Sequence, residues 1–578
     1  MATQTTPYPA VQGGSFLIED RRPEEIFTPE DFSDEHRQIA RTADQFFANE
    51  VAPNAERLEQ KDYALTRELL RKAAEVGLTS IDIPERFGGM ELDMASSAIV
   101  AEHMAHNGSF AASFGAHAGI GTTPILFFGS EEQKARYLPR LASAELISSY
   151  ALTEAHAGSD ALAARARAEL TPDGRHYVLN GEKMWITNGG FADLYIVFAK
   201  VDGEKFTAFI VEKAFGGVAP GAEERKMGLD GSSTTPLILN DCKVPVENVL
   251  HEVGRGHIVA FNVLNMGRLK LGAVCVGGCK GLLQHAARYA KERKAFGKPI
   301  AEFGLIQQKL AQMAVRAFAA EGILYRTTGM IDALYERDRE AADAGRKALE
   351  EYAVECAINK VYGSEALFFV ADEAVQIYGG YGYHHDYPPE RAFRDCRINR
   401  IFEGTNEINR LLTTGMLMKR AMSGQLALIP AAQRLMNEAL SGPAADADAV
   451  GHIKKIVLLA AGVAFQKHKQ ALADQQEVVA AISNIVMEAF VTETAQLRTR
   501  KMGGRSPQAE DMTAVLLYEA VGRAEAEAKT VLAACAEGDA LRAQLAVLRR
   551  FTRMEPIDVV AARRRIAQRV LDAGRYLV

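Results

Sequence analysis

The sequence predicts an α+β protein whose helical bundles and β-domain occupy separate parts of the chain. At 578 residues the chain exceeds what a single hydrophobic core usually supports, so its length predicts several domains. Apolar residues recur with helical spacing over long blocks, and one internal block consists of short β-branched runs punctuated by Gly and Asn. Because the two kinds of segment are segregated and do not alternate, a doubly wound parallel sheet is disfavoured.

Taken in order, these changes of pattern divide the chain into five segments. Helical spacing is clear from Ser33 onward, and near Tyr150 it gives way to short apolar runs that predict a small antiparallel β-domain. Helical periodicity returns after Gly256. The expected segments are an N-terminal arm (1–32), an N-terminal α-helical domain (33–148), a middle β-domain (149–257), an α-helical bundle domain (258–425) and an additional C-terminal α-helical domain (426–578), with a linker at Ser441–Ala449.

The composition is that of a globular intracellular protein. Hydrophobic residues make up 48% and charged residues 24%, and the net charge of −7 gives no general reason to expect a nucleic-acid partner. Six scattered cysteines favour a reducing compartment. The first residues lack a signal-peptide pattern, and the longest apolar run, Ile456–Phe465, is shorter than a membrane span. We therefore expect a bacterial cytoplasmic protein without an N-terminal targeting sequence, and peripheral membrane contact remains open.

Common nucleotide and metal motifs are missing from the sequence. No Gly-x-Gly-x-x-Gly follows a strand, and no Gly-x-x-x-x-Gly-Lys-Ser/Thr loop is present. His251 and Glu252 begin a zinc-helix pattern that Arg255 cannot complete. Pairs such as His103 and His106 are more typical of an ordinary helix face. The sequence therefore predicts no metal site, and any nucleotide cofactor must be bound in another way.

Three segments are candidates for the functional site: Tyr150–Asp160, Met184–Gly190 and Arg400–Arg410. Separately, they could be a helix N-cap and turn, a hairpin end that buries the only Trp, and a loop capped by Thr405. In this order and at these separations, they resemble the signatures of the acyl-CoA dehydrogenase family. The resemblance runs from about residue 30 to 425, and Arg293–Lys298 and Gln376–Gly382 resemble the family's cross-subunit cofactor motifs.

The resemblance implies the acyl-CoA dehydrogenase fold, with a C-terminal four-helix-bundle domain, and a noncovalent FAD. It places Thr405 and Glu407 at a helix N-terminus, where free N–H groups suit an anionic pyrophosphate. Because part of the cofactor site comes from a neighbouring subunit, it also implies at least a dimer. The implied cofactor-binding residues are Tyr150, Leu152, Thr153 and Ser159 along the flavin, Trp185, Ile186 and Thr187 on its other side, and Arg293, Phe296, Gln376, Ile377, Gly379 and Gly380 from the neighbouring subunit.

Glu403 stands at the family's usual position for the catalytic base, between Phe402 and Gly404. Removing a proton α to a thioester needs a base whose pKa rises when substrate excludes water, because desolvation disfavours a charged carboxylate. In the family, the enolate oxygen accepts hydrogen bonds from the base's own N–H and from a flavin ribityl hydroxyl. Hydride then passes to flavin N5.

Substrate contacts are also implied by the resemblance. Asn265 and Arg268 are three residues apart and share a helix face, although a surface Arg beside a packing Asn would show the same spacing. Small residues where medium-chain relatives have bulkier ones predict a deep acyl pocket, since each buried methylene contributes about 0.8 kcal/mol. The expected substrate-binding residues are Ser159, Asn265, Arg268, Phe402, Gly404, Ala112, Gly115 and Ala116.

Pocket residues and the C-terminal extension together resemble the very-long-chain subfamily most closely. The resemblance implies a homodimer, a long-chain acyl-CoA substrate and electron-transfer flavoprotein as acceptor. Two alternatives remain open, namely an assembly or scaffold protein on the same fold and an acyl-CoA oxidase. Ala155 and His156 depart from the family pattern beside the flavin, and a local polar contact is expected for His156. Nine Arg against three acidic residues in 541–578 are expected to form a solvated helix face or a dimer contact.

Overall fold

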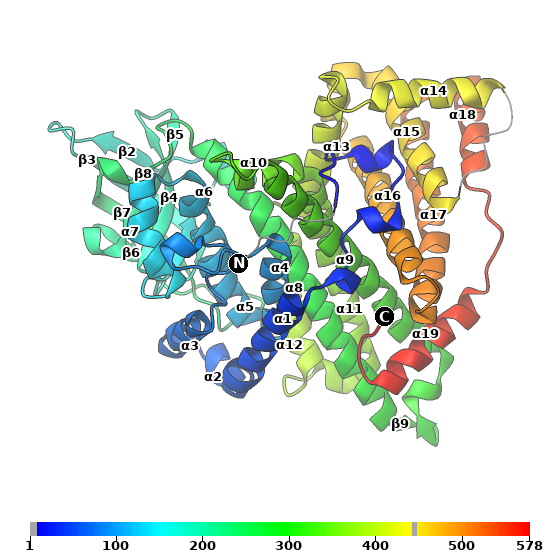
Figure 1. Ribbon diagram of the computed structural model, residues 1–578, viewed down its shortest axis with the longest axis horizontal. Coiled ribbons are helices and arrows are strands. Elements are labelled where there is room, and N and C mark those ends of the chain that lie inside the picture. Colours follow the sequence, from blue (N-terminus) through cyan, green and yellow to red (C-terminus); the bar gives the residue numbers. More distant parts are fainter. Residues whose placement is uncertain (1–7, 442–447) are drawn as a thin grey trace.

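The computed structural model describes residues 8–441 and 448–578. Figure 1 shows the β-domain at one end of an elongated molecule, the C-terminal helices at the other, and the long helices of the bundle between them. This confirms the predicted α+β fold with segregated helical blocks. Most of the predicted linker, and the first residues used to exclude a targeting sequence, lie outside the described ranges.

Capping side chains set the starts of two helices in the N-terminal segment. Ser33 caps the first helix by accepting a hydrogen bond from the His36 N–H (3.1 Å), and Asp93 caps α4 through the Ser96 N–H (2.8 Å). These caps fix where the two helices start. The helices are α1 (Asp34–Phe46), α2 (Ala55–Glu59), α3 (Tyr63–Glu75), α4 (Met94–Met104), α5 (Gly108–Gly115), α6 (Thr123–Phe128) and α7 (Glu131–Ala142).

The middle domain is one mixed sheet, in which β1 pairs with β4 beside the main strand order β6-β7-β3-β2-β4-β5-β8. Most pairings are antiparallel as predicted, but β1–β4 and β2–β4 are parallel. The apolar run of β4 is buried on both faces, which is why it does not alternate with polar residues. The strands are β1 (Ser148–Ala151), β2 (Arg167–Leu170), β3 (His176–Thr187), β4 (Leu194–Val201), β5 (Lys205–Glu212), β6 (Val218–Pro220), β7 (Thr234–Pro245) and β8 (Val249–Leu250).

The bundle is built on a close parallel packing of its two central helices, α8 and α11, whose contacts run from Gly272–Asn359 to Tyr289–Tyr378. Small residues permit this approach, since a Cβ on Gly363 would already contact Cys275 at 3.3 Å. The bundle comprises α8 (Gly256–Glu292), a hairpin of β9 (Lys294–Ala295) and β10 (Lys298–Pro299), α9 (Gly304–Asp338), α10 (Ala344–Glu351), α11 (Ala353–Tyr378), α12 (Pro388–Cys396) and α13 (Asn406–Met422).

The C-terminal helices share one continuous hydrophobic core with the bundle. Helix α16 packs against α9 and α13, and α19 packs against α9. The extension is therefore part of the folded body and not an appended tail. Its helices are α14 (Leu428–Ser441), α15 (Ala449–His468), α16 (Gln476–Met502), α17 (Pro507–Cys535), α18 (Gly538–Phe551) and α19 (Val559–Ala573).

Three helical segments of the described chain are long and apolar enough to cross a membrane by length and composition: Gly256–Glu292, Ala449–Asp474 and Gln476–Met502. The prediction from the longest uninterrupted apolar run missed them, because an isolated polar residue breaks a run without making a helix polar. In the first and third segments, 72% and 83% of the most apolar window is buried inside the protein. Burial between neighbouring helices of the protein therefore accounts for the hydrophobicity of these two segments.

A buried charge network joins the extension to the rest of the chain. Arg498 on α16 is 1% exposed and contacts Glu30 of the N-terminal arm (2.7 Å) and Glu321 of α9 (2.7 Å). Glu321 also pairs with Lys280 of α8 and accepts a hydrogen bond from the Tyr576 hydroxyl (2.7 Å). Because each charge has a partner, the network tolerates burial, and one guanidinium connects three parts of the chain.

We expect Arg498→Ala to destabilise the protein by about 1–3 kcal/mol, because the buried Glu321 carboxylate keeps only Lys280 as a charged partner and α16 loses its ion pair with Glu30. Urea-induced unfolding followed by circular dichroism measures this difference. Arg542→Ala is the matched control, since Arg542 is exposed and its ion pair is with the exposed Asp539. A loss in Arg498→Ala no larger than that in the control would contradict the assignment of this contact as a junction.

Candidate functional site

Glu403 lies in the turn that leads into α13, and its backbone has an unusual conformation. Its φ is +56° and that of Gly404 is +77°, so two successive residues adopt the left-handed region. Such a conformation costs a non-glycine residue of order 1–3 kcal/mol and persists only where surrounding contacts impose it. Thr405 then caps α13 as predicted, accepting a hydrogen bond from the Ile408 N–H (3.2 Å).

Three side chains hold this turn by its carbonyl oxygens. Arg268 donates to the Glu403 carbonyl (3.3 Å), Lys360 donates to the Gly404 carbonyl (2.7 Å), and the Asn409 amide donates to the carbonyls of Glu403 and Gly404 (3.3 and 2.8 Å). The interactions with Lys360 and Asn409 were not predicted. Asn409 lies within the motif Arg400–Arg410, which was its only sequence signal, whereas nothing in the sequence places Lys360 beside this turn.

Gly267 on α8 makes room for the Glu403 carboxyl group. A Cβ at position 267 would lie 2.3 Å from Glu403 Oε2 and 2.7 Å from its carboxyl carbon, which is far inside van der Waals contact. The helix therefore needs glycine here because of close approach, even though glycine weakens a helix interior. The sequence analysis missed this residue, although it directly precedes the predicted Arg268.

Arg268 is not a surface residue, so the alternative interpretation of the Asn265–Arg268 pair is wrong for Arg268. Both side chains are buried, and Arg268 Nη1 donates to Asn265 Oδ1 at 2.8 Å. With Nε on the Glu403 carbonyl, the guanidinium joins α8 to the turn. The pair holds the turn in place and also supplies positive charge next to the carboxylate.

Burial sets the protonation of the Glu403 carboxyl group. Oε2 is inaccessible to solvent and has no hydrogen-bond partner among the described residues. Desolvation raises the Glu403 pKa from 4.5 to about 7, and the charges of Arg268 and Lys360 counteract this rise only in part. Burial likewise lowers the pKa of Lys360 to about 8. A carboxyl group with a pKa near neutrality can both accept and release a proton at physiological pH.

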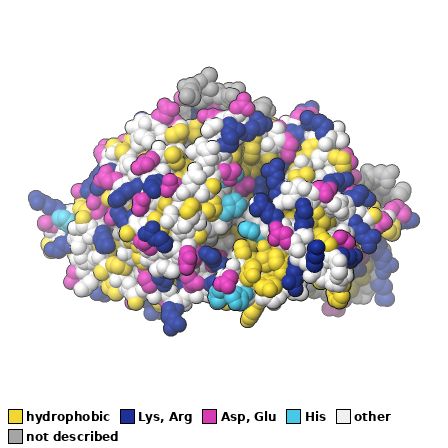
Figure 2. All heavy atoms as spheres, turned by 90° about the horizontal axis from the view of Figure 1, so that it is seen from below, with side chains coloured by type: hydrophobic (Ala, Val, Ile, Leu, Met, Phe, Trp, Pro, Cys, Tyr) yellow, Lys and Arg dark blue, Asp and Glu magenta, His cyan; other side chains and the backbone are white. Residues whose placement is uncertain are grey.

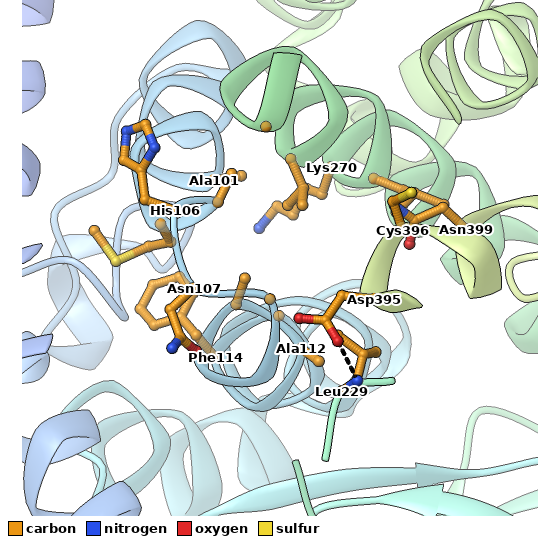
Figure 3. Close-up of a pocket in the computed structure, with 18 of the residues that line it drawn as sticks. Ala101, His106, Asn107, Ala112, Phe114, Leu229, Lys270, Asp395, Cys396 and Asn399 are labelled. Carbon is orange, nitrogen blue, oxygen red and sulfur yellow. Dashed lines mark hydrogen bonds between the residues drawn. The ribbon is translucent and has the colours of Figure 1, made fainter. Parts of the chain in front are cut away.

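A cavity of about 610 Å³ extends from Glu403 into the protein between α4, α5, α8 and α12. Its predicted lining residues are present, since Ala112, Gly115 and Ala116 lie on one wall and Thr187 and Phe402 lie near Glu403. In Figure 3, Lys270 points into the cavity from one wall and Asp395 lies on another, where it accepts a hydrogen bond from the Leu229 N–H (2.5 Å). Much of the lining is apolar, and the ammonium group of Lys270 is paired with Asp82 (2.6 Å).

The two predicted flavin segments meet in the middle domain. Tyr150 lies on β1, and burial together with the nearby Glu403 carboxylate raises its pKa. Lys183 on β3 donates to the Leu152 carbonyl (3.2 Å) and pairs with Glu154 (2.7 Å) in a fully buried contact that ties the two segments together. His156 lies 3.6 Å from Glu154, which is the local polar contact that was expected.

Trp185 is exposed, so the interpretation in which a hairpin end buries the only Trp is wrong. Its side chain is 57% exposed, and its φ is +58°, so an energetically costly conformation presents an indole to solvent. Ser159 is also exposed, whereas Ile186 is buried. A large apolar ring held in the open is typical of a surface that a ligand or another chain covers.

The residues predicted to act across subunits form a separate exposed group. Phe296 and Gly297 both have positive φ and make the two-residue turn of the β9–β10 hairpin, which leaves Phe296 96% exposed. Arg293 lies over the Tyr381 ring at 5.7 Å. Gln376, Gly379 and Gly380 are exposed at the end of α11, while Ile377 is buried, and Glu407 is exposed on α13. None of this group is among the described residues that line the cavity.

Together these features can support proton transfer to a carboxylate at the head of a mostly apolar cavity. No cluster of three or more His, Cys, Asp or Glu side chains suited to a metal occurs in the described ranges. The geometry therefore fits a reaction in which a long apolar molecule presents an acidic C–H bond to Glu403.

Comparisons with known proteins agree with this geometry. Residues 33–145, 149–242 and 254–417 match the family descriptions "Acyl-CoA dehydrogenase" N-terminal, middle and C-terminal domain, and residues 452–550 match a further "Acyl-CoA dehydrogenase, C-terminal domain". The chain is 46% identical over 585 residues to a "Probable acyl-CoA dehydrogenase" of Bacillus subtilis, with 98% of each covered. It is 39% identical over 385 residues to the very long-chain specific enzyme of Rattus norvegicus, covering 64% of this chain and 57% of that protein.

Solved structures show the same relationship. An acyl-CoA dehydrogenase complexed with FAD from Bacillus anthracis matches with a TM-score of 0.97 and 48% identity, covering 98% of this chain and all of that one. Butyryl-CoA dehydrogenase from Megasphaera elsdenii matches with a TM-score of 0.61 and 35% identity, covering 67% of this chain and 99% of that one. The extension thus occurs in the first relative and lies beyond the part matched by the second.

The raised pKa of Glu403 predicts a pH-dependent stability difference. A carboxyl group whose pKa is higher in the folded than in the unfolded state stabilises the fold at low pH, and this contribution is lost as pH rises from about 4.5 through 7. At 1.36 kcal/mol per pKa unit, Glu403→Gln should be more stable than the parent by up to about 3 kcal/mol at pH 8, and by little near pH 4. Unfolding of both proteins across this range measures it, and a difference independent of pH would refute a raised pKa.

Proposed function

Because the chain belongs to the acyl-CoA dehydrogenase family, we propose that it oxidises long- or very-long-chain acyl-CoA thioesters to trans-2-enoyl-CoA in fatty acid β-oxidation. The observation that carries this proposal is the desolvated Glu403 carboxyl group at the head of a long apolar cavity. A short-chain enzyme would need no such depth, and a hydrolase would need a nucleophile or activated water in place of a lone carboxylate.

FAD is the proposed cofactor, and the residues present fit it. The exposed Trp185, the half-buried Thr187 and Tyr150 would hold the flavin ring, and Thr187 lines the same cavity as Glu403. A nucleotide pyrophosphate suits the free N–H groups at the N-terminus of α13, beside Thr405 and Glu407. When bound, FAD would supply the hydride acceptor that side chains lack.

Glu403 removes the proton from the substrate's α-carbon in the proposed mechanism. A substrate chain in the cavity displaces water from the carboxylate and so increases its basicity. Negative charge then develops on the thioester oxygen, which the N–H of Glu403 is assigned to stabilise as a hydrogen-bond donor. Arg268, Lys360 and Asn409 contribute by positioning, because their contacts with the carbonyls of Glu403 and Gly404 hold the turn to which this N–H belongs.

The preference for long chains rests on the length of the cavity and its small residues. Lining residues of α8 run from Gly267 to His285, which at 1.5 Å per residue is about 27 Å of helix. A Cβ at Gly115 would meet no atom within 4 Å, so open space lies where a larger side chain would close the cavity. Each additional methylene that is buried contributes about 0.8 kcal/mol.

A homodimer and electron-transfer flavoprotein are the proposed partners. The exposed group of Arg293, Phe296, Gln376, Gly379 and Gly380 is suited to the cofactor of a second subunit, since these residues do not line the cavity that holds Glu403. Two exposed glycines allow a backbone to approach a ligand closely. The similarity to an acyl-CoA dehydrogenase complexed with FAD favours electron-transfer flavoprotein as the protein that accepts electrons from the reduced flavin.

Glu403→Gln tests the assigned base. We expect palmitoyl-CoA to bleach the bound flavin of the parent protein under anaerobic conditions, and the variant to reduce it at least about 10²–10⁴-fold more slowly, because the amide cannot accept the proton. Stopped-flow absorbance of the flavin measures the rate. Flavin content and palmitoyl-CoA binding of the variant serve as controls, and reduction at the parental rate would disprove the role of Glu403.

Gly115→Leu tests the acyl cavity. The new side chain enters open space, so we expect normal folding and a fall in kcat/KM for palmitoyl-CoA of roughly 30-fold, as expected when several methylenes can no longer be buried. Activity with octanoyl-CoA should change little. Gly522→Leu, at an exposed helical glycine with no atom near its Cβ position, is the control. An equal effect on both chain lengths would place the acyl chain elsewhere.

A further inference from the structure

The cavity reaches solvent at the end opposite Glu403. Its lining on α8 begins at Gly267, beside the Glu403 carboxyl group, and continues to Gly281, where an added Cβ would lie 2.8 Å from His106 Nδ1. These glycines are 14 residues apart, or about 21 Å along the helix. His106 and His285 are both exposed. The cavity therefore follows α8 for about four turns and opens to solvent at a point distinct from the Glu403 end.

Polar side chains border this second opening, which we call the distal mouth and define by His106, His285, Asp386 and Arg391. They come from three places in the fold, namely the α4–α5 turn, α8 and the start of α12. Viewed from below, the surface is hollowed near its centre, and histidines and basic side chains gather there (Figure 2). Arg391 is partly exposed and approaches Glu59 only at 3.7 Å.

The His106 imidazole can donate or accept a hydrogen bond at the distal mouth. Its ring packs on Phe47 (centroids 5.4 Å apart), and partial desolvation of the ring in this contact, together with the charge of His103, lowers its pKa and favours the neutral imidazole. A neutral imidazole offers one donor and one acceptor nitrogen. Between the distal mouth and Glu403 the wall is largely apolar, with Ala112, Gly115 and Met104 among its residues.

Resting on the proposed function, we infer that the tail of a long acyl chain emerges at the distal mouth, so that the substrates include long acyl-CoA thioesters with a polar ω-terminus. A closed apolar pocket would exclude such chains, because burying an unpaired polar group costs several kcal/mol and an unpaired charge costs more. At the distal mouth, a terminal carboxylate or hydroxyl group stays hydrated and can contact Arg391 or His106. A medium-length chain is too short to reach the distal mouth, so its polar end would be buried without a partner in the apolar part of the cavity.

The acceptance of an ω-carboxyl group should depend on the length of the acyl chain. A site that simply tolerates polar groups would accept it at every length. We compare ω-carboxyacyl-CoA thioesters with their methyl-ended counterparts, from the eight-carbon to the eighteen-carbon pair, by anaerobic flavin reduction in the holoenzyme. The ratio of their kcat/KM values should be below about one thirtieth for the medium chains, and should rise to within about threefold of unity for the longest. A ratio that stays low at all lengths, or is equally high at all lengths, overturns the inference.

Gly281→Leu tests the distal mouth directly. Its side chain would fill the rim beside His106, whose ring is free to give way, so we expect the hexadecanedioyl-CoA rate to fall at least about tenfold with octanoyl-CoA oxidation retained. Gly522→Leu is the control. Unchanged hexadecanedioyl-CoA activity in Gly281→Leu overturns the inference. Failure of the parent with palmitoyl-CoA would instead refute the proposed function.

Discussion

The burial of one carboxyl group without a hydrogen-bond partner is the constraint on which the rest of the site depends. Glu403 Oε2 is enclosed against Gly267, and the fold tolerates this only because the surrounding turn is held from three sides. Arg268, Lys360 and Asn409 all contact carbonyl oxygens of the turn and leave the carboxyl group unpaired. A direct salt bridge would lower the Glu403 pKa and remove the basicity that the proposed reaction needs.

Helix α8 connects nearly every functional feature. Its first half carries Asn265, Gly267 and Arg268 beside the turn, and the following residues form a wall of the cavity. Gly281 and His285 then reach the distal mouth. Because the helix is a rigid element packed against α4, α9 and α11, the separation between base and distal mouth is fixed by its geometry. The distance along α8 thus sets how long an acyl chain must be to reach the distal mouth.

The extension stabilises this arrangement from the other side. Its core is continuous with that of the bundle, and Arg498 joins it to Glu30 and Glu321. Lys280, which pairs with Glu321, lies on α8 directly before Gly281. The extension therefore stabilises α8 near the distal end of the cavity. It contributes to the site by holding this helix in place and not by contacting the substrate.

Sequence alone determined the order of the helical and β-blocks and the cap residues Ser33 and Thr405, because periodicity and capping are local properties, and its resemblance to the family singled out Glu403 as the candidate base. It erred on the exposure of Trp185, the parallel pairings of β1 and β2 with β4, and the apolar character of helices whose runs are interrupted. Only the tertiary structure placed Gly267 and Lys360 beside Glu403 and revealed the distal mouth. These features bring together residues tens to hundreds of positions apart, and close approach between such elements leaves no periodic signal in the chain.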